Sequence, residues 1–447
     1  MKRRILLLAG LLALLLTGCF FQSPEDLWTL PKLSDDQSNL QSKLDEVLAT
    51  GLTTTAPISG AQTVQLQDLD GDGVDEAVAF FRDNSAGAER PLKIYLFRQN
   101  QEGLYETAAV IEGEGNAIQS IAFEQLNEGA VKELVVSWQL SSNVYTLTVY
   151  SIEQYNVMEL LRSSYTRFTV QDMDQDNIKE VVLLHLDASG EIGSRAELYE
   201  YTGGTMTRTS SAYLSRSMTS VLQVRYGYLK GTMPALFLTG AYSGTDTVRV
   251  TDILAMRDGV LTNITLDQET WDSTGTTRTY LASPQDINGD SVLEIPMPRS
   301  LLSYDNNSIA DSQWIIDWQQ YDILGNAASV CITYHNNQDG WYLTLPEHWV
   351  DQLTITRKDT IYGERTVIFS RTRGEDQPPE AFLVLYTLTG DNRAIRSQIG
   401  NRQVLLTTSD TIYAAEFLDS SWDCGVDMDA LRLERFHLIT TEWSTQE

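Results

Sequence analysis

The side chains best suited to chemistry are the acids of a short turn, Asp68-Leu69-Asp70-Gly71-Asp72-Gly73-Val74-Asp75-Glu76. The same frame returns at residues 172–180 and at residues 286–294. Oxygen atoms at alternate positions of a tight turn converge on one point, and Ca²⁺ takes six to eight oxygens at about 2.3–2.6 Å. Glycines at positions 4 and 6 of the first turn permit the bend. The pattern therefore predicts calcium sites.

Positions 1, 3, 5 and 9 of each turn would supply side-chain oxygens, and position 7 would supply a backbone carbonyl. The predicted ligands are Asp68, Asp70, Asp72, Val74 and Glu76 in the first turn, Asp172, Asp174, Asp176, Ile178 and Glu180 in the next, and Asp286, Asn288, Asp290, Val292 and Glu294 in the last. We expect structural ions, with the first site the tightest. The alternative is a set of plain turns whose side chains bond their own backbone.

An apolar strand follows each turn, and the residue before it recurs at intervals of about 50 residues, the length of one four-stranded propeller blade. Weaker turns lie at residues 125–133, where Gln125 and Gly129 replace acids and we expect no ion, and around residues 226–233. Alternating strands with turn signals continue from about residue 55 to residue 335. We predict a mainly β protein with a β-propeller of about five four-stranded blades over residues 55–337. A sixth blade could lie in the regions where the turn motif is degenerate.

The acidic turns resemble the FG-GAP/VCBS class of propeller repeats, whose loops bind calcium. The resemblance covers residues 60–335 and depends on three well-matched turns. The whole layout is similar to VCBS-repeat lipoproteins of clostridia-like bacteria. The resemblance implies a calcium-binding propeller and implies no enzymatic activity.

The first residues indicate export. Lys2, Arg3 and Arg4 precede an apolar run over residues 5–16, too short for a bilayer, which needs about 20 residues. The ending Leu16-Thr17-Gly18-Cys19 resembles the lipobox of bacterial lipoproteins. That resemblance implies a signal peptide over residues 1–18 and a lipid on Cys19. We expect the protein on the extracytoplasmic face of the cell membrane, anchored by acyl chains.

The composition narrows the classes of partner. The chain has 61 acidic and 32 basic residues, giving a net charge of −29. Nucleic acid is excluded as a partner, because binding requires cationic side chains that displace counterions. Direct docking on an anionic membrane surface is disfavoured for the same reason. A divalent cation, and a neutral or basic partner, fit this charge.

The regions outside the repeats have their own patterns. Residues 19–54 should form a tether and one short helix, since Leu40, Leu44, Val47 and Leu48 lie on one helical face of residues 36–50. Residues 338–447 lack the acidic turns, and we predict a smaller α+β domain there. Its expected strands are 341–346, 353–357, 366–370 and 381–388, followed by a closing hairpin of 404–408 and 411–417, with helices at 390–397 and 428–437. The alternative is extra blades.

The sequence contains no recognisable catalytic motif, so an enzyme is less favoured than a binding protein. The four histidines are unpaired at metal spacing, and His185 reads as a strand-end residue. Cys331 and Cys424 could form a disulfide or remain free thiols. Tryptophans such as Trp138, Trp271, Trp314 and Trp318 mostly read as blade core but could line a sugar-binding face.

Three functions remain open. The first is a binding or scaffold protein for an unknown protein or glycan partner. The second is an envelope assembly or sensor subunit acting through residues 338–447. The third is a polysaccharide-active enzyme using propeller carboxylates.

Overall fold

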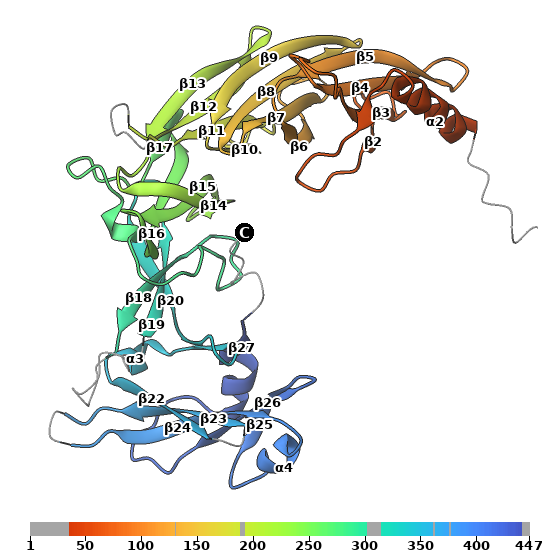
Figure 1. Ribbon diagram of the computed structural model, residues 1–447. Helices are drawn as coiled ribbons and strands as arrows, with labels where there is room; N and C mark the ends of the chain where they lie inside the picture. Colours follow the sequence, from red (N-terminus) through yellow and green to blue (C-terminus); the bar gives the residue numbers. More distant parts are fainter. Residues whose placement is uncertain are drawn as a thin grey trace, which may run out of the picture. The chain divides into compact units, whose positions relative to one another are not determined.

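The computed structural model describes residues 35–129, 131–187, 193–301, 314–360, 363–374 and 377–439 (Figure 1). The predicted signal peptide, the lipidated Cys19 and the tether up to residue 34 lie outside these residues. The chain forms two compact units. The first contains the chain up to Phe123 together with Ala130–Glu159, and the second contains Glu124–Gly129 and the chain from Leu160.

The predicted N-terminal helix is confirmed as α2, Asp35–Leu48. Leu40, Leu44 and Leu48 pack with the buried Val47 against one face of the first sheet, including Phe81. An amphipathic stripe of this kind stabilises a short helix through burial rather than through propensity. None of the described helices combines the length and apolarity needed to span a bilayer.

The first unit contains two antiparallel sheets. The strands of the first sheet are β1 (Thr53–Thr54), β2 (Val64–Gln67), β3 (Glu76–Arg82), β4 (Leu92–Gln99) and β5 (Tyr105–Gly113). Those of the second are β6 (Ala117–Glu124), β7 (Glu133–Ser141), β8 (Val144–Glu153) and β9 (Asn156–Tyr165), and the last strand runs on into the second unit. The sheets share a core that includes Phe80, Ile94, Trp138 and Tyr150.

The second unit begins with two four-stranded meanders. The strands of the third sheet are β10 (Arg167–Gln171), β11 (Glu180–His185), β12 (Arg195–Thr202) and β13 (Thr205–Tyr213). Those of the fourth are β14 (Met218–Leu229), β15 (Met233–Tyr242), β16 (Thr245–Arg257) and β17 (Val260–Asn263), followed by the 3₁₀ turn η1 (Thr274–Thr276). Leu184 and Leu198 of the third sheet pack against Leu236 and Leu254 of the fourth.

The fifth sheet takes its last strand from the end of the chain. It contains β18 (Ile295–Ser300), β19 (Trp314–Tyr321), β20 (Ala327–Asn336), β21 (Trp341–Thr344) and β27 (Phe436–Leu438). The domain boundary predicted between residues 337 and 338 therefore falls inside a sheet, between β20 and β21. The physical reason is that β20 and β21 form a tight hairpin, with Asn336 paired to Trp341, which the loss of the acidic turns does not interrupt.

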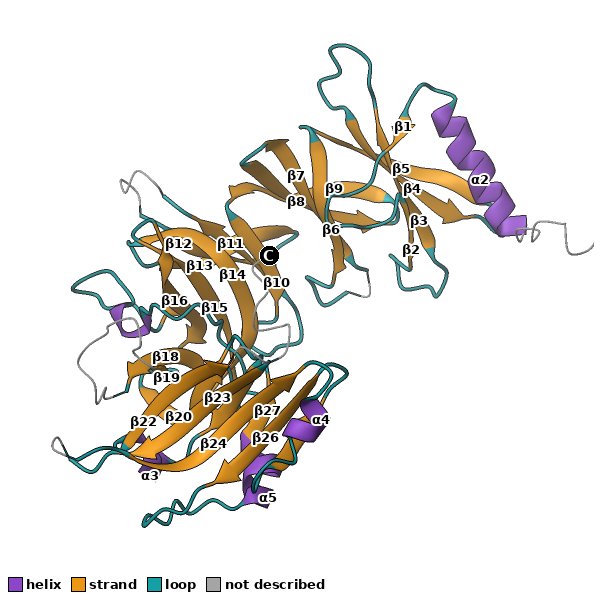
Figure 2. Cartoon of the chain, turned by 60° about the horizontal axis from the view of Figure 1, so that its bottom comes forward, coloured by secondary structure: helices purple, strands orange, loops and turns teal. Residues whose placement is uncertain are grey.

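The final sheet follows. Its strands, in spatial order, are β22 (Leu353–Thr360), β23 (Glu364–Arg371), β24 (Glu380–Thr389), β26 (Thr411–Phe417) and β25 (Gln403–Thr407). Figure 2 shows this region as orange strands with only short purple helices, among them α4 and α5. The predicted hairpin at its end is confirmed. The accompanying helical segments are short, namely α3 (Glu347–Val350), α4 (Arg393–Arg396), α5 (Met428–Ala430) and the π turn η3 (Leu431–Arg435). This sheet and the fifth sheet share one core, where Phe369 packs on Tyr334.

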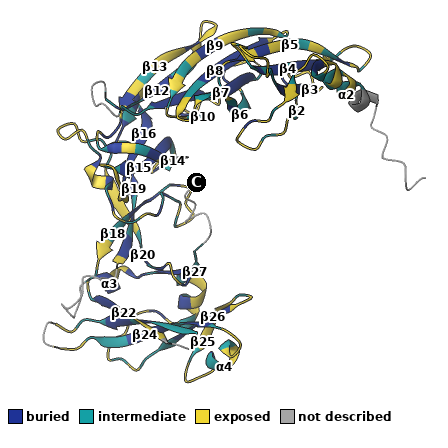
Figure 3. Ribbon diagram, viewed as in Figure 1, coloured by how far each residue is buried: buried dark blue, intermediate teal, exposed yellow. Residues whose placement is uncertain are grey.

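The mainly β class is confirmed, and five successive sheets repeat along residues 53–344. In four of them the strand that follows the acidic or degenerate turn is almost wholly buried, as β3, β7, β11 and β15 (Figure 3). These strands are continuous apolar runs, because both of their faces are covered. In these four sheets the turn therefore leads directly into a strand that is almost wholly buried.

Candidate metal centres

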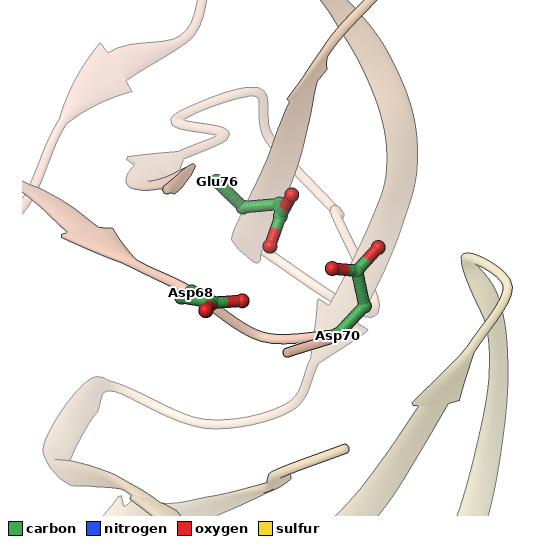
Figure 4. Close-up of side chains that lie close together, drawn as sticks. All are labelled: Asp68, Asp70 and Glu76. Atoms are coloured by element: carbon green, nitrogen blue, oxygen red, sulfur yellow. The ribbon is translucent and has the colours of Figure 1, made fainter. Parts of the chain in front are cut away.

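The first turn brings three of its predicted ligands together. Carboxylate oxygens of Asp68, Asp70 and Glu76 lie within 4.8 Å of one another (Figure 4). Glu76 is the first residue of β3 and is 2% exposed. Its Oε2 accepts a 2.8 Å hydrogen bond from the Leu69 N–H, and Tyr155 donates to its Oε1. Burial raises the pKa of Glu76 above its ordinary value of 4.5, and the charge of Asp70 raises it further.

The backbone of this turn wraps around the Asp68 carboxylate. Asp68 accepts from the N–H groups of Gly71 at 2.7 Å and Gly73 at 3.1 Å. Both glycines are in the left-handed region, with φ of 77° and 87°, which is the conformation that glycine adopts without a steric cost. Asp72 lies outside the three-carboxylate group and accepts from the Val74 N–H at 2.7 Å.

The turn at residues 172–180 repeats this scheme. Asp172 accepts from the N–H groups of Gln175 at 2.6 Å and Asn177 at 3.0 Å. Neither of these two residues is glycine, yet both have φ of 70°. A left-handed non-glycine residue costs about 1–3 kcal/mol, so surrounding contacts must hold this turn in shape.

The three carboxylates of that turn also converge. Oxygens of Asp172, Asp174 and Glu180 lie within 4.8 Å of one another, while Asp176 accepts from Ile178 N–H. Glu180 is 4% exposed, and its Oε2 accepts from a backbone N–H at 2.7 Å. Burial and the three neighbouring acids raise the pKa of Glu180 to about 8. Burying such a group stabilises its neutral form unless a cation compensates the charge.

The turn at residues 286–294 is the third copy. Asp286, Asp290 and Glu294 form the carboxylate group, and Asn288 instead bonds to Asp290 through its amide at 3.1 Å. Glu294 is fully buried, and Ile287 N–H donates to its Oε2 at 2.9 Å. Burial raises the pKa of Glu294 to about 7.

Two of the three sites are covered by a donor from elsewhere in the fold. The Tyr155 hydroxyl donates to Asp70 Oδ2 and Glu76 Oε1, both at 3.1 Å. Gln320 on β19 places its Nε2 at 2.6 Å from Asp290 Oδ2 and 2.7 Å from Glu294 Oε1. Each donor lies between the two carboxylates that would share a cation.

The site at residues 172–180 differs from the other two. Within the described part of the chain, no side chain from outside the turn donates to Asp174 or Glu180. The nearest equivalent, the Tyr226 hydroxyl, donates to the Asp172 carbonyl at 2.9 Å. The carboxylates of this turn are therefore the least satisfied of the three groups.

The degenerate turns form no such group among the described residues. Gln125 occupies the position of the first acid and donates its amide to the Gly129 carbonyl at 3.1 Å. Glu133, at position 9, is nevertheless fully buried, like its three counterparts. The second turn thus keeps the backbone role of the motif after losing the acids.

The turns are linked to the preceding sheet. The N–H at position 8 donates to a carbonyl in the preceding turn in two cases: Lys132 to Leu69 at 3.0 Å, and Lys179 to Gln125 at 3.2 Å. In the fifth repeat, the Leu293 N–H donates to the carbonyl of Tyr228 in the fourth sheet at 3.0 Å. Within each unit, these bonds tie a turn to an earlier part of the chain as well as to the strands of its own sheet.

Sequence reasoning missed a second polar cluster. Glu197 on β12 is 3% exposed, and accepts from Arg195 at 2.8 Å, Arg208 at 2.7 Å and Tyr199 at 2.9 Å. His185 Nε2 lies 3.2 Å from Glu197, so this strand-end histidine belongs to a charged group. Burial opposes ionisation of Glu197, but the three donors outweigh it and lower the pKa to about 2. Polar residues at alternate positions of one strand were the available signal.

The structure also places the cysteines and tryptophans that the sequence analysis singled out. Cys331 and Cys424 are both free thiols, which answers the open question of a disulfide for this structure. Trp138 and Trp318 are core residues, at 1% and 0% exposed. Trp271 and Trp314 are exposed instead.

No family model and no curated protein matches this sequence. The chemistry of the three turns must therefore be argued from their donor sets. Each set offers three hard oxygen donors around one point, and two of the three glutamates have a pKa raised to near neutrality by burial. Such a set fits a hard divalent cation better than it fits a soft metal, which prefers sulfur or imidazole ligands.

Proposed function

We propose that this chain is a lipid-anchored, extracytoplasmic binding protein whose acidic turns hold calcium as a structural ion. In this proposal, the five repeated sheets are the blades of a β-propeller. Support for the blades comes from the succession of antiparallel sheets, three of four strands and two of five, and from cores shared by neighbouring sheets. The anchor is the lipid on Cys19, and the partner is a protein or a glycan.

The observation that carries the calcium proposal is the repetition of one hydrogen-bond scheme in three turns. Position 1 accepts from positions 4 and 6, and position 9 accepts from position 2, in all three copies. A plain turn requires the first of these features but does not require a buried glutamate at position 9. That glutamate brings a third carboxylate to the same point in each turn.

Calcium fits these donors better than magnesium does. Ca²⁺ accepts irregular shells of six to eight oxygens, whereas Mg²⁺ demands a near-ideal octahedron. In the first two turns the three converging carboxylates would be joined by the acid at position 5 and the carbonyl at position 7, namely Asp72 and Val74, or Asp176 and Ile178. In the third turn the position-5 acid, Asp290, already belongs to the group, and Asn288 and the Val292 carbonyl would join it. Those position-5 acids now accept from position 7, so binding requires a local rearrangement.

The geometry favours a structural ion over a catalytic carboxylate pair. The glutamates are buried, and a backbone N–H inside each turn already occupies one of their oxygens. A general acid must reach its substrate, and these groups are covered. Compensating their charge would stabilise the sheets by linkage, since calcium would bind the folded state alone.

A calcium titration tests this proposal. Calorimetry and thermal melting would be performed on the soluble fragment from Ser23, on a triple variant carrying Asp70→Asn, Asp174→Asn and Asp290→Asn, and on an Asn127→Ala control in the degenerate turn. We expect saturable binding and a raised Tm in the fragment and the control, with both reduced in the triple variant. Absence of heat and of a Tm shift at millimolar calcium would contradict the proposal.

The anchor is tested separately. Expression of the full chain in a bacterial host with labelled palmitate should label the wild type and not a Cys19→Ala variant. An unlabelled wild type recovered from the medium would indicate an ordinary secretory signal instead.

A further inference from the structure

Two exposed aromatic rings meet edge to face in the second unit. Tyr213 at the end of β13 is 51% exposed, and Trp271, which follows β17, is 39% exposed. Their ring centroids lie 5.4 Å apart with an interplanar angle of 88°. Most other described tryptophans are core residues, so exposure of Trp271 is a departure from how this chain uses the residue.

The backbone holds Trp271 in a disfavoured conformation. Its φ is 60°, in the left-handed region that large side chains avoid. The Trp271 N–H donates to the Asp267 carbonyl at 2.8 Å, and its carbonyl accepts from the Arg216 N–H at 2.9 Å. Both backbone groups are thus fixed, and the ring projects from a rigid position.

The loop around Trp271 is built by two aspartates. Asp267 accepts from the N–H groups of Glu269 and Thr270, both at 2.8 Å. Asp272 accepts from the backbone and hydroxyl of Ser217, again both at 2.8 Å. The loop is tied to itself and to the start of β14, which removes most of the entropy cost of ordering the ring for a ligand.

We propose that the Tyr213–Trp271 pair binds an uncharged saccharide. This inference rests on the proposed role as a binding protein, and it names the class of ligand. Rigid aromatic rings supply a large apolar contact area at low entropic cost, and the apolar C–H face of a sugar ring matches such a surface. Asp267, Glu269 and Thr270 belong to the same loop as Trp271 and are exposed, so their polar groups can exchange water for sugar hydroxyls.

Other classes of ligand fit this surface less well. A stable protein interface buries about 1,200–2,000 Å² in total, far more than two rings present. An anionic glycan would meet exposed acids on a chain of net charge −29. A neutral saccharide needs neither a large area nor a positive patch.

Affinity electrophoresis of the fragment from Ser23 in native gels tests the proposal. The gels contain a neutral polymer, namely hydroxyethyl cellulose, glycol chitin or glucomannan, or the anionic polymer polygalacturonate. The key variant is Trp271→Asn, because asparagine tolerates a left-handed φ and the folded loop should survive. The matched control is Trp314→Ala, which removes a tryptophan that is 47% exposed on β19.

We expect at least one neutral polymer to retard the wild type and the Trp314→Ala control. Trp271→Asn and Tyr213→Ala should weaken that retardation at least tenfold, while Trp271→Asn leaves the Tm unchanged or higher. The calcium-induced Tm shift, measured on the same samples, should persist in all four proteins.

Three results would overturn the inference. The first is no retardation by any neutral polymer, and the second is equal retardation of the wild type and Trp271→Asn. The third is a lowered Tm in Trp271→Asn, which would show that the ring stabilises the fold. A preserved calcium response beside any of these results would leave the proposed calcium binding standing. If the wild type shows no calcium response but is still retarded by a neutral polymer, the proposed calcium binding falls and the proposed saccharide binding stands.

Discussion

The hydroxyl of Tyr155 lies 3.1 Å from the Glu76 carboxylate, although the two residues are 79 positions apart in the sequence. The same hydroxyl contacts Asp70 at 3.1 Å, so it bridges two of the three converging acids of the first turn. Burial and these acids raise the pKa of Tyr155 well above its ordinary value of 10, so the hydroxyl stays protonated and donates. A cation that shares both carboxylates must displace this donor.

Removing the hydroxyl should therefore favour calcium at the first turn. We expect Tyr155→Phe to tighten calcium binding there several-fold, and to lower the stability of the calcium-free protein by about 1 kcal/mol through loss of charge-assisted hydrogen bonds. Calorimetry in a background of Asp174→Asn and Asp290→Asn isolates this site. Tyr145→Phe on β8 is the control, because its hydroxyl donates to the Ser142 carbonyl. Weaker binding in Tyr155→Phe would mean that the hydroxyl is a calcium ligand.

The three turns should fill in an order set by these donors. Asp174 and Glu180 have no donor from outside their turn among the described residues, whereas Gln320 covers Asp290 and Glu294. We expect the turn at residues 172–180 to bind first, contrary to the expectation from sequence that the first turn is tightest. Asp174→Asn should then weaken the first binding step at least tenfold, and Asp70→Asn should leave that step unchanged. The reverse result would show that the covering donors do not control affinity.

The Glu197 cluster should give the protein an acid-sensitive stability. Burial opposes ionisation of this carboxyl, but its donors hold the folded-state pKa at about 2, below the ordinary value of 4.5. The ionised form therefore favours folding. This stabilisation is present above pH 4.5 and is lost as the pH falls from about 4.5 to about 2.

Urea unfolding across that pH range measures the effect. We expect the wild type to lose on the order of 2 kcal/mol through this group, a value reduced by the partial exposure of Arg195 and Arg208. Glu197→Gln should be less stable at pH 7 and should show a shallower decline with acid. An unchanged acid slope in Glu197→Gln would assign the decline to other carboxyls.

The last two sheets should unfold together. Phe369 on β23 is fully buried and packs edge-on against Tyr334 on β20, with ring centroids 5.5 Å apart. We expect Phe369→Ala to cost about 3–5 kcal/mol. Hydrogen exchange should then show loss of protection in β20 as well as in β23.

The control for this prediction is Leu433→Ala, since Leu433 is 74% exposed and should change stability by less than about 0.5 kcal/mol. If β23 loses protection in Phe369→Ala while β20 keeps it, the two sheets unfold independently. The predicted boundary near residue 338 would then lie close to a division between two folding units.

The sequence alone was enough to predict the local structure. The acidic turns, the apolar strands after them, α2 and most strands of the last sheet lie where the patterns indicated. These features depend on residues within about ten positions of one another, such as Asp68 with Gly71, or Leu44 with Val47. Hydrophobic periodicity and turn chemistry are local properties, so they can be read without a fold.

The tertiary structure decided which groups meet across the chain. Tyr155 reaches Glu76, Gln320 reaches Glu294, and β27 returns to pair with β21, through contacts whose partners lie tens of residues apart. No local pattern encodes such pairs, because they arise only when sheets pack together or when strands distant in the sequence pair. The sequence alone was thus enough to locate the acidic turns. Their predicted order of calcium affinity depends on neighbouring side chains that only the tertiary structure brings close.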